Sequence, residues 1–356
     1  MDIELKNVLK QESGETYIHP TSLKLKSGVF NVLLGKTLAG KTTLMRLMAG
    51  LEKPTDGEVW FDDKNVTDIP VQRRNIAMVY QQFINYPNWS VYDNIASPLK
   101  IAHYSESEIK QRVHEVCEIL KLTPLLQRQP NELSGGQQQR IALARALVKQ
   151  AGLILLDEPL ANLDYKLREE LREELPRLFS DSGTTVVYAT TEPTEALLLG
   201  GYTVTLHEGK ACQYGETHEV FKNPASLISA LTFSDPPLNC ASLEKKKNRF
   251  WLDQDIHWPV NSGFHHLADG PYLLGFRPHQ LSMNPETVDS ICLHGQIDIS
   301  EINGSESLLH FTVNHHQWVS QLHGVHKLEP GTRARLYLNP QNCFLFDANG
   351  NRAVIS

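Results

Sequence analysis

The nine residues 35–43 have the types and spacing that bind phosphate. They read GKTLAGKTT, which fits G-x-x-x-x-G-K-[ST], and they lie between an apolar run, 30–34, and a helical segment, 42–49. In this context the glycines let backbone N–H groups point at phosphate oxygens, and the helix start adds its positive dipole end. We expect Lys41 to reach the β- and γ-phosphates and Thr42 to ligate Mg²⁺. The other candidates for phosphate contact are Gly35, Lys36, Thr37, Leu38, Ala39, Gly40 and Thr43.

Two adjacent carboxylates supply a second piece of chemistry. The segment LILLDEP, 153–159, is an apolar run that ends in Asp157 and Glu158. We expect Asp157 to hold the Mg²⁺ shell and Glu158 to polarise an attacking water. Gln81 ends another apolar run, 76–80, and can touch both metal and water. The alternative for Glu158, a surface carboxylate beside a turn, is less favoured because Asp157 and Pro159 flank it.

A third motif, LSGGQ at 133–137, places a serine hydroxyl and glycine N–H groups at a helix start. It is a phosphate-binding element without a lysine, which makes sense if it contacts the γ-phosphate of a nucleotide held by another chain. With this motif and the carboxylates downstream, a glycine-rich turn that binds nothing becomes a poor explanation of residues 35–43. A small-molecule kinase would have no use for LSGGQ.

The elements that must position these motifs have an α/β pattern. Strands are expected over 3–8, 23–25 and 30–34, with a polar turn at 11–20, followed by a hairpin at 57–70. The run 153–156 is apolar on both faces and predicts a central parallel strand, and 184–189 predicts another buried strand. A charged helix is expected over 165–178, bent or ended by Pro176.

Residues 83–150 predict a helical insert. Ser105 and Glu108 form a capping box that opens a helix, and a second helix follows the Ser-Gly-Gly turn at 134–136. The segment 83–92 concentrates aromatic side chains among asparagine and proline residues: Phe83, Tyr86, Trp89 and Tyr92. We favour an interface over ordinary core for this segment, because exposed aromatics and few charges are typical of interface centres.

After a linker-like SDPPLN at 234–239, the chain predicts a small all-β barrel or sandwich. Turns rich in Gly, Asn and Pro separate the strand-like runs 250–252, 272–276, 296–299, 308–313, 318–322, 333–338 and 343–346.

Length, cysteine content, apolar runs and net charge limit the classes of protein to which this chain can belong. The chain has 356 residues, 41% hydrophobic, which allows two or three domains, and five scattered cysteines that read as free thiols in a reducing compartment. No apolar run approaches the length of a membrane span, and the first residues lack the apolar core of a secretion signal. The net charge of −7 argues against a nucleic-acid surface.

Most of the fifteen histidines lie in the C-terminal third, including the adjacent pairs 265–266 and 315–316. Neighbouring residues on a strand point to opposite faces, so neither pair is expected to form a two-ligand metal site. Polar strand and loop residues are the favoured interpretation over a metal or pH-sensing cluster.

The order of the motifs resembles a known family. GxxxxGKT, VYQ (79–81), LSGGQ, LLDEP (155–159) and NLD (162–164) together look like the ATP-binding subunit of an ABC transporter, over residues 1–232. The tail, 233–356, with GFRP at 275–278, resembles the oligonucleotide-fold-like (TOBE-type) regulatory domain of sugar and polyol importers of the maltose and glycerol-phosphate type. The implied fold is an α/β P-loop domain with a helical insert at about 83–150, plus a C-terminal all-β, OB-like domain.

The resemblance also implies cofactors, partners and roles. Two such subunits sandwich two ATP molecules with Mg²⁺ and drive import through two membrane permease subunits, fed by an extracytoplasmic solute-binding protein. The chain would sit peripherally on the cytoplasmic face of the inner membrane, with no nucleic acid partner. Glu158 would be the catalytic base, Asp164 would lie at the dimer seam, and Tyr86 and Trp89 would contact the permease. Residues from the motif LSGGQ would contact the opposite nucleotide: Ser134, Gly135, Gly136 and Gln137.

Three positions depart from the family. Leu38 replaces a glycine or small residue and is expected to crowd the phosphate loop. Tyr17 is the nearest candidate for the adenine-stacking aromatic, although it lies close to the loop in sequence. Thr191 occupies the position of a catalytic switch histidine. We therefore expect a slow site and a heterodimer with a different ATPase subunit, while a homodimer compensated by Glu192 stays open.

One alternative class also stays open at this point. A soluble ABC-type ATPase acting on DNA or the ribosome would share the ATP-binding motifs. Such proteins usually carry two cassettes or a long coiled-coil insert, and this chain shows neither pattern.

Overall fold

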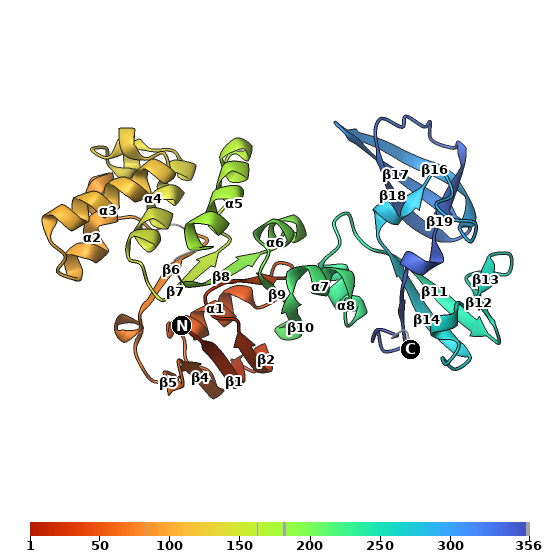
Figure 1. The fold of residues 1–356 in the computed structure, drawn as a ribbon, viewed down its shortest axis with the longest axis horizontal. Helices are drawn as coiled ribbons and strands as arrows, with labels where there is room; N and C mark the ends of the chain where they lie inside the picture. The colour runs from red at the N-terminus through yellow and green to blue at the C-terminus, as the bar shows by residue number, and fades with distance from the viewer. Residues whose placement is uncertain (83, 162, 181–182, 354–356) are drawn as a thin grey trace. The chain divides into compact units, whose positions relative to one another are not determined.

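The computed structural model describes residues 1–82, 84–161, 163–180 and 183–353. The chain divides into two compact units, Met1–Val220 and Phe221–Ser356 (Figure 1). This division falls somewhat earlier in the chain than the boundary expected after residue 232. Each unit is described separately below.

A six-stranded sheet forms the centre of the N-terminal unit. Its order is β10-β9-β3-β8-β7-β6, and all neighbours are parallel except β10, which is antiparallel to β9. The strands are β3 (Phe30–Leu34), β6 (Ile76–Val79), β7 (Leu153–Asp157), β8 (Thr185–Thr190), β9 (Tyr202–His207) and β10 (Lys210–Glu216). Every residue of β7 is buried, which confirms the predicted central strand. Because parallel strands share one carboxyl edge, the segments after β3, β6, β7 and β8 emerge together.

A second, antiparallel sheet has the order β2-β1-β4-β5. Its strands are β1 (Ile3–Glu12), β2 (Glu15–Leu25), β4 (Asp56–Phe61) and β5 (Lys64–Asn65). The polar turn expected at 11–20 is wrong in extent, because Gln11 already pairs with Thr16 and only Ser13 and Gly14 form the turn. Helix α1 (Lys41–Ala49) contacts β2 of this sheet and β7 and β8 of the other, so its apolar residues are shared by both.

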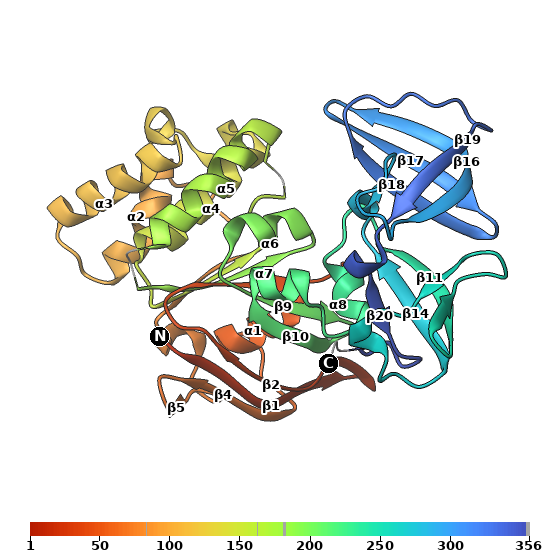
Figure 2. The ribbon, with the colours of Figure 1, turned by 45° about the vertical axis from the view of Figure 1, so that its right-hand side comes forward.

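Three helices make a separate lobe of the N-terminal unit, visible at the upper left of Figures 1 and 2. They are α2 (Val91–Ile101), α3 (Glu106–Ile119) and α4 (Gly135–Val148), and each contacts the other two. Ser105 opens α3 with the predicted capping box to Glu108. The expected helical insert is therefore present between β6 and β7.

Three further helices follow strands of the main sheet: α5 (Tyr165–Ser180), α6 (Pro193–Leu199) and α7 (Thr217–Lys222). Helix α8 (Leu227–Thr232) comes after α7 and belongs to the C-terminal unit. Pro176 does not end α5, which continues to Ser180. Short 3₁₀ turns are η1 (Val71–Arg73), η2 (Thr123–Leu125), η3 (Pro130–Glu132), η4 (Ser262–Phe264), η5 (Pro278–Gln280) and η6 (Pro340–Asn342).

The C-terminal unit consists of two five-stranded antiparallel sheets around one main core. Their orders are β13-β12-β11-β14-β20 and β15-β19-β16-β17-β18, an arrangement consistent with the expected OB-like domain. The first sheet contains β11 (Asn239–Lys246), β12 (Arg249–Trp251), β13 (His257–Pro259), β14 (Gly270–Phe276) and β20 (Phe344–Phe346). The second contains β15 (Leu281–Ser282), β16 (Ile291–Asn303), β17 (Glu306–Val313), β18 (His316–His323) and β19 (Arg333–Leu338).

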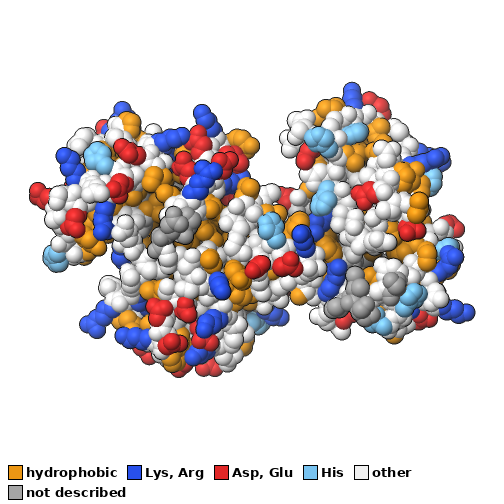
Figure 3. Space-filling view, viewed as in Figure 1, with side chains coloured by type: hydrophobic (Ala, Val, Ile, Leu, Met, Phe, Trp, Pro, Cys, Tyr) orange, Lys and Arg blue, Asp and Glu red, His pale blue; other side chains and the backbone are white. Residues whose placement is uncertain are grey.

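The surface carries both signs of charge. On the face drawn in Figure 3, acidic and basic side chains are intermixed on each unit rather than gathered in one basic stripe. Within the described residues, no helix combines the length and apolar character needed to cross a membrane.

Candidate nucleotide-binding site

The phosphate loop connects β3 to α1 and is closely packed at its two glycines. A Cβ atom on Gly35 would lie 2.5 Å from the Leu206 carbonyl oxygen, and one on Gly40 would lie 2.8 Å from Ile18 Cδ1. Gly40 also has φ of 96°, a left-handed backbone that glycine adopts without penalty. These two positions therefore require glycine, as the motif predicts.

Lys41 is folded into this loop. Its side chain is 5% exposed, and its ammonium donates hydrogen bonds to the carbonyl oxygens of Gly35, at 2.8 Å, and Lys36, at 3.2 Å. Burial lowers the pKa of Lys41, while the nearby Glu158 carboxylate partly opposes that change. The loop thus holds a cation beside the carbonyl groups that shape it.

Leu38 does not crowd the loop as expected. Its side chain is 94% exposed and projects away from the packed residues, while its backbone has φ of 68°. The consequence of replacing a small residue is therefore backbone strain, because a branched side chain disfavours the left-handed region. Lys36 and Thr37 beside it are also exposed, and Ala39 is buried beneath them.

The ends of β6 and β7 bring the predicted metal and catalytic side chains to Lys41 and Thr42. The Thr42 hydroxyl donates to Asp157 Oδ2 at 2.8 Å, and the Lys41 ammonium lies 3.4 Å from Glu158 Oε1. The Gln81 amide donates to Glu158 Oε2 at 3.0 Å. Burial raises the pKa of Asp157, although the Thr42 hydrogen bond works against it. Residues from three separate motifs therefore meet at one sheet edge.

The backbone at Glu158 is also unusual. Its φ is 46°, and its N–H donates to the Ala189 carbonyl oxygen of β8 at 3.0 Å. A left-handed backbone at a non-glycine residue costs of order 1–3 kcal/mol and is frequent at functional sites. Thr191 is exposed and lies two residues beyond Ala189. Strand β8 therefore brings this position, where the family has a histidine, to the same sheet edge.

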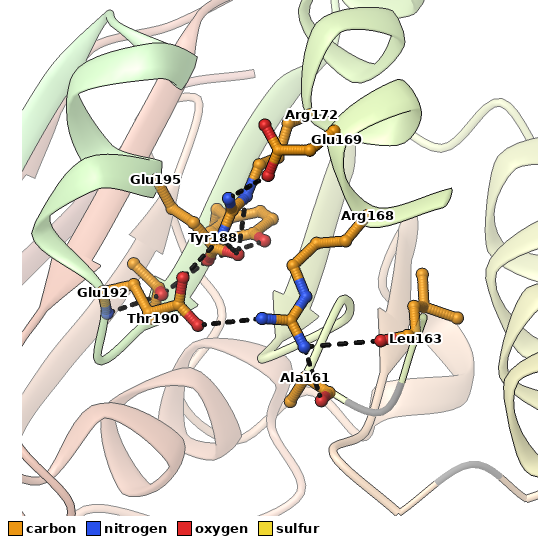
Figure 4. Close-up of polar contacts among 9 residues, drawn as sticks. All are labelled: Ala161, Leu163, Arg168, Glu169, Arg172, Tyr188, Thr190, Glu192 and Glu195. Atoms are coloured by element: carbon orange, nitrogen blue, oxygen red, sulfur yellow. Dashed lines mark hydrogen bonds and ion pairs between the residues drawn. The ribbon is translucent and has the colours of Figure 1, made fainter. Parts of the chain in front are cut away.

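Two arginines, which the sequence analysis did not single out, organise the segments around Thr191 (Figure 4). Arg172 of α5 pairs with Glu192 and Glu195, and Glu195 accepts hydrogen bonds from Tyr188 and Thr190 of β8. This cluster fixes the end of β8 against α5. Both arginines belong to a strongly charged helix, where spacing alone does not separate buried from solvated charges.

Arg168 connects the same cluster to the segment after Glu158. It pairs with Glu192 and donates to the carbonyl oxygens of Ala161 and Leu163. Because two arginines pair with Glu192, its carboxylate is not free to compensate for the missing histidine at position 191 (Figure 4).

The LSGGQ segment lies at the start of α4. Ser134 caps this helix, accepting from the Gln137 N–H, and Gln137 returns a hydrogen bond to the Ser134 N–H. Ser134 and Gly135 are exposed, and Gly136 is half-buried. The first N–H groups of α4 therefore face solvent, where an anion from outside can reach them.

Two further predicted residues have local roles. Asp164 accepts from the Leu167 N–H at 3.0 Å and so caps α5, with its side chain at the surface. Tyr17 is 45% exposed, and its backbone carbonyl borders Gly40 and Gly209. The neighbouring Glu15 carboxylate raises the pKa of Tyr17. Asn162 of the NLD motif lies outside the described residues.

Residues 18–161 match the family model described as ABC transporter. Over 355 residues the chain is 36% identical to the sn-glycerol-3-phosphate import ATP-binding proteins UgpC of Escherichia coli (strain K12) and Shigella boydii serotype 4, covering 99% of each chain. This chain belongs to the ABC transporter family. It is an ATP-binding subunit whose ATP hydrolysis is coupled to transport.

Solved ABC cassettes share the fold. A dimeric post-hydrolysis structure of the cassette MJ0796 bound to ADP and Pi is 32% identical, with a TM-score of 0.56, and covers 60% of this chain and 98% of that one. A second dimeric structure of MJ0796, a bacterial ABC transporter cassette, has the same values. These relatives give no support to the expected heterodimer with a different ATPase subunit.

The aromatic side chains expected at the permease lie on the surface of the ABC subunit's helical lobe. Tyr86 is 41% exposed and Trp89 is 45% exposed, with ring centroids 4.5 Å apart. The fully buried Asn94, another residue not anticipated, bonds to the backbone of both. Tyr92 is the second residue of α2, and Phe83 lies outside the described residues.

Proposed function

We propose that this ABC subunit powers import of a sugar, polyol or related small solute, with sn-glycerol-3-phosphate as the first candidate, through separate membrane permeases. The observation that carries this proposal is the end-to-end match to import ATP-binding proteins, which includes the C-terminal unit as well as the ATP-binding unit. The subunit would act on the cytoplasmic face of the membrane, and a solute-binding protein outside would deliver the solute.

The residues at the sheet edge fit Mg²⁺ and ATP. Thr42 Oγ1 and Asp157 Oδ2 lie 2.8 Å apart, close to the roughly 2.9 Å between neighbouring oxygen ligands of an octahedral ion with bonds of about 2.05 Å. Gln81 offers a third oxygen. The bound ion would neutralise charge on the phosphates. Lys41 would contact the terminal phosphates, and Glu158 would accept a proton from the attacking water.

The second ATP site requires another cassette. The exposed α4 start, with Ser134 and Gly136, would contact the γ-phosphate held by the phosphate loop of a partner chain, and Asp164 would lie at that seam. Dimeric cassettes among the solved relatives support this arrangement.

The permease would dock against the helical lobe. A groove of about 340 Å³ lies between β6, α2 and α4, and Tyr86 borders it. Two exposed isoleucines, Ile84 and Ile101, also line it. Few natural surfaces of monomers keep such apolar side chains together without a partner.

The whole proposal is tested by deleting the gene and measuring uptake of labelled sn-glycerol-3-phosphate, maltose and glycerol, with the tagged subunit purified from membranes in parallel. We expect loss of uptake of one solute and co-purification of two permeases. Recovery with ribosomes or DNA, with all uptake unchanged, would contradict the proposal.

The docking surface is tested by Tyr86→Ser combined with Trp89→Ser. The double variant should lose transport or dissociate from the permeases, while the isolated subunit keeps its ATP affinity. Trp60→Ser, a half-buried tryptophan on β4 of the other sheet, is the matched control. A double variant that transports at the normal rate would refute this surface.

A further inference from the structure

Three potential metal ligands meet in the C-terminal unit, far in sequence from the ATP motifs. They are Asp253, which follows β12, and His315 and His316, at the turn from β17 to β18. One ligand atom from each lies within 4.8 Å of the others. The aspartate lies in the loop between β12 and β13 of the first sheet, and the histidines lie at the turn between β17 and β18 of the second, so the cluster connects the two sheets.

The histidine pair differs from the sequence expectation. Neighbouring strand residues would point apart, but β18 begins only at His316, and His315 lies in the turn after Asn314, whose φ is 52°. The two imidazole rings consequently lie with centroids 4.0 Å apart. The turn, rather than the strand, decides where the pair points.

The surroundings hold two of the ligands in place. The His316 ring stacks on Trp318, with centroids 5.1 Å apart and an interplanar angle of 7°. The Asn314 amide donates to Asp253 Oδ2 at 2.9 Å and orients that carboxylate. Such outer contacts commonly position the ligands of a metal.

One buried atom is left without a partner. His316 Nε2 is buried and makes no hydrogen bond among the described residues, although the Asp253 carboxylate lies 3.8 Å away. A buried polar atom without a partner costs free energy and calls for a physical explanation. An ion between His316 and Asp253 would satisfy both groups.

We propose that Asp253, His315 and His316 bind one divalent transition-metal ion, with Zn²⁺ as the preferred ion. Two imidazole nitrogens and one carboxylate oxygen suit Zn²⁺ rather than Mg²⁺ or Ca²⁺, which take oxygen ligands. Each histidine lies 3.8 Å from the Asp253 carboxylate, whereas tetrahedral ligands of Zn²⁺ are about 3.3 Å apart. His315, 71% exposed, can rotate to shorten its own separation, and a small shift of the Asp253 carboxylate would shorten the one to His316.

The bound ion would brace the two sheets of the C-terminal unit. Three protein ligands leave a fourth position for water or for a group from another molecule. Because the site requires the folded arrangement of both sheets, Zn²⁺ should raise the melting temperature of this unit.

The test uses the full chain without an affinity tag or nucleotide, with Mg²⁺ in excess so that Mg²⁺ rather than Zn²⁺ occupies the site at Thr42 and Asp157. Zn²⁺ is titrated by calorimetry, and Co²⁺ by its visible absorption. We expect one Zn²⁺ per chain with micromolar or tighter affinity, a tetrahedral Co²⁺ spectrum, and a higher melting temperature.

Variants assign the ligands. Asp253→Asn keeps the shape of the side chain and should weaken Zn²⁺ binding more than tenfold, as should His316→Asn. Asn314→Gly, which removes the orienting contact and keeps the left-handed backbone of the turn, should weaken it about tenfold. His265→Asn, from the other adjacent histidine pair, is the matched control and should change nothing.

Circular dichroism and melting of the metal-free variants separate lost binding from lost folding. If Asp253→Asn and His316→Asn fold normally and still bind Zn²⁺ like the unmodified chain, the site is refuted. Absence of Zn²⁺ binding to the unmodified chain below millimolar concentration would refute it equally.

Discussion

The phosphate loop and the LSGGQ segment, the two proposed phosphate-binding elements of the chain, have opposite designs. The loop is closely packed: Gly35 and Gly40 leave no room for any side chain, and Lys41 is buried within it. The LSGGQ segment is an open helix start, with Ser134 and Gly135 exposed and no lysine in the motif. Both use backbone N–H groups, but only the loop adds a cation.

The difference implies that the phosphate loop binds ATP, whereas the LSGGQ segment completes an ATP site held by another chain. A concave loop with a buried cation and two adjacent carboxylates can hold ATP within one chain. An exposed helix end has only its dipole and a few donors, worth about 0.3–1 kcal/mol at an exposed site, so it needs a nucleotide already held by something else. The comparison therefore predicts that changes in the loop reduce ATP binding by the isolated chain. Changes in LSGGQ should reduce only the activity of two chains that have paired.

Lys41→Ala should have the largest effect. It removes the cation at the terminal phosphates, so ATP affinity should fall roughly 10²-fold and hydrolysis should become undetectable, because charge-assisted contacts are the strong ones. Fluorescent-nucleotide binding to the isolated chain measures the change. Lys24→Ala, an exposed lysine of β2, is the matched control.

Glu158→Gln should reduce hydrolysis by roughly 10²–10³-fold while leaving ATP affinity unchanged, since only the proton acceptor is lost. The variant should accumulate as an ATP-bridged dimer in gel filtration. Equal loss of ATP affinity in this variant and in Lys41→Ala would contradict the role of Glu158.

Ser134→Ala should leave ATP binding to the isolated chain intact and slow hydrolysis by the paired form about 10²-fold, since one donor at the γ-phosphate is removed. Mixing Lys41→Ala chains with Ser134→Ala chains should restore part of the activity. Each mixed pair contains one site with an intact loop and an intact signature. No gain on mixing would mean that the two elements do not meet across chains.

Thr191→His should raise hydrolysis about tenfold, because an imidazolium contact replaces a neutral hydroxyl and the two differ by roughly 1.4 kcal/mol. Steady-state ATPase measurements on the purified chain, with Thr191→Asn as a neutral control, decide this. A brisk rate for the unmodified chain that Thr191→His leaves unchanged would show that Thr191 does not limit the site.

Asp157→Asn should abolish Mg²⁺-dependent hydrolysis by removing a proposed metal ligand, and its effect on the stability of the nucleotide-free chain is the smallest change expected here. Burial raises the pKa of Asp157 in the folded chain, so its charged form costs stability above that pKa, and the cost disappears as the pH falls through it. Without nucleotide, the variant should melt about 2–4 °C higher at about pH 7.5, equivalent to roughly 1 kcal/mol, and the gain should shrink as the pH is lowered. A lower melting temperature than the unmodified chain across the whole pH range would contradict this.

The sequence predicted the ATP-binding unit well where a motif or a periodic pattern dominated. The apolar run of β7 and the capping box of Ser105 are local signals, and both were confirmed. The hairpin β9–β10 escaped notice because buried Thr203 and Thr205 read as polar. Strand β11 was missed for a similar reason: Lys245 is buried against Asp269, a partner that lies distant in the sequence.

The contacts around the ATP site show the same limit. Spacing could indicate that Asp157 and Glu158 work together, but it could not show that Arg168 and Arg172 hold the neighbouring segments, because those pairs form only after α5 packs against α6. The histidine turn at 315–316 was misread for a related reason, since a single left-handed residue, Asn314, reversed the direction of a side chain.

Helix α1 begins at the phosphate loop and has its apolar side between two sheets, with Leu44, Leu47 and Met48 fully buried. Its amide protons should therefore exchange with solvent only when both sheets open together. ATP binding at its first turn should slow that opening across the shared core, while the helical lobe, which has its own contacts, keeps a separate exchange rate. Deuterium uptake measured for individual peptides should therefore slow on ATP binding in α1 and its two sheets, and change less in the helical lobe.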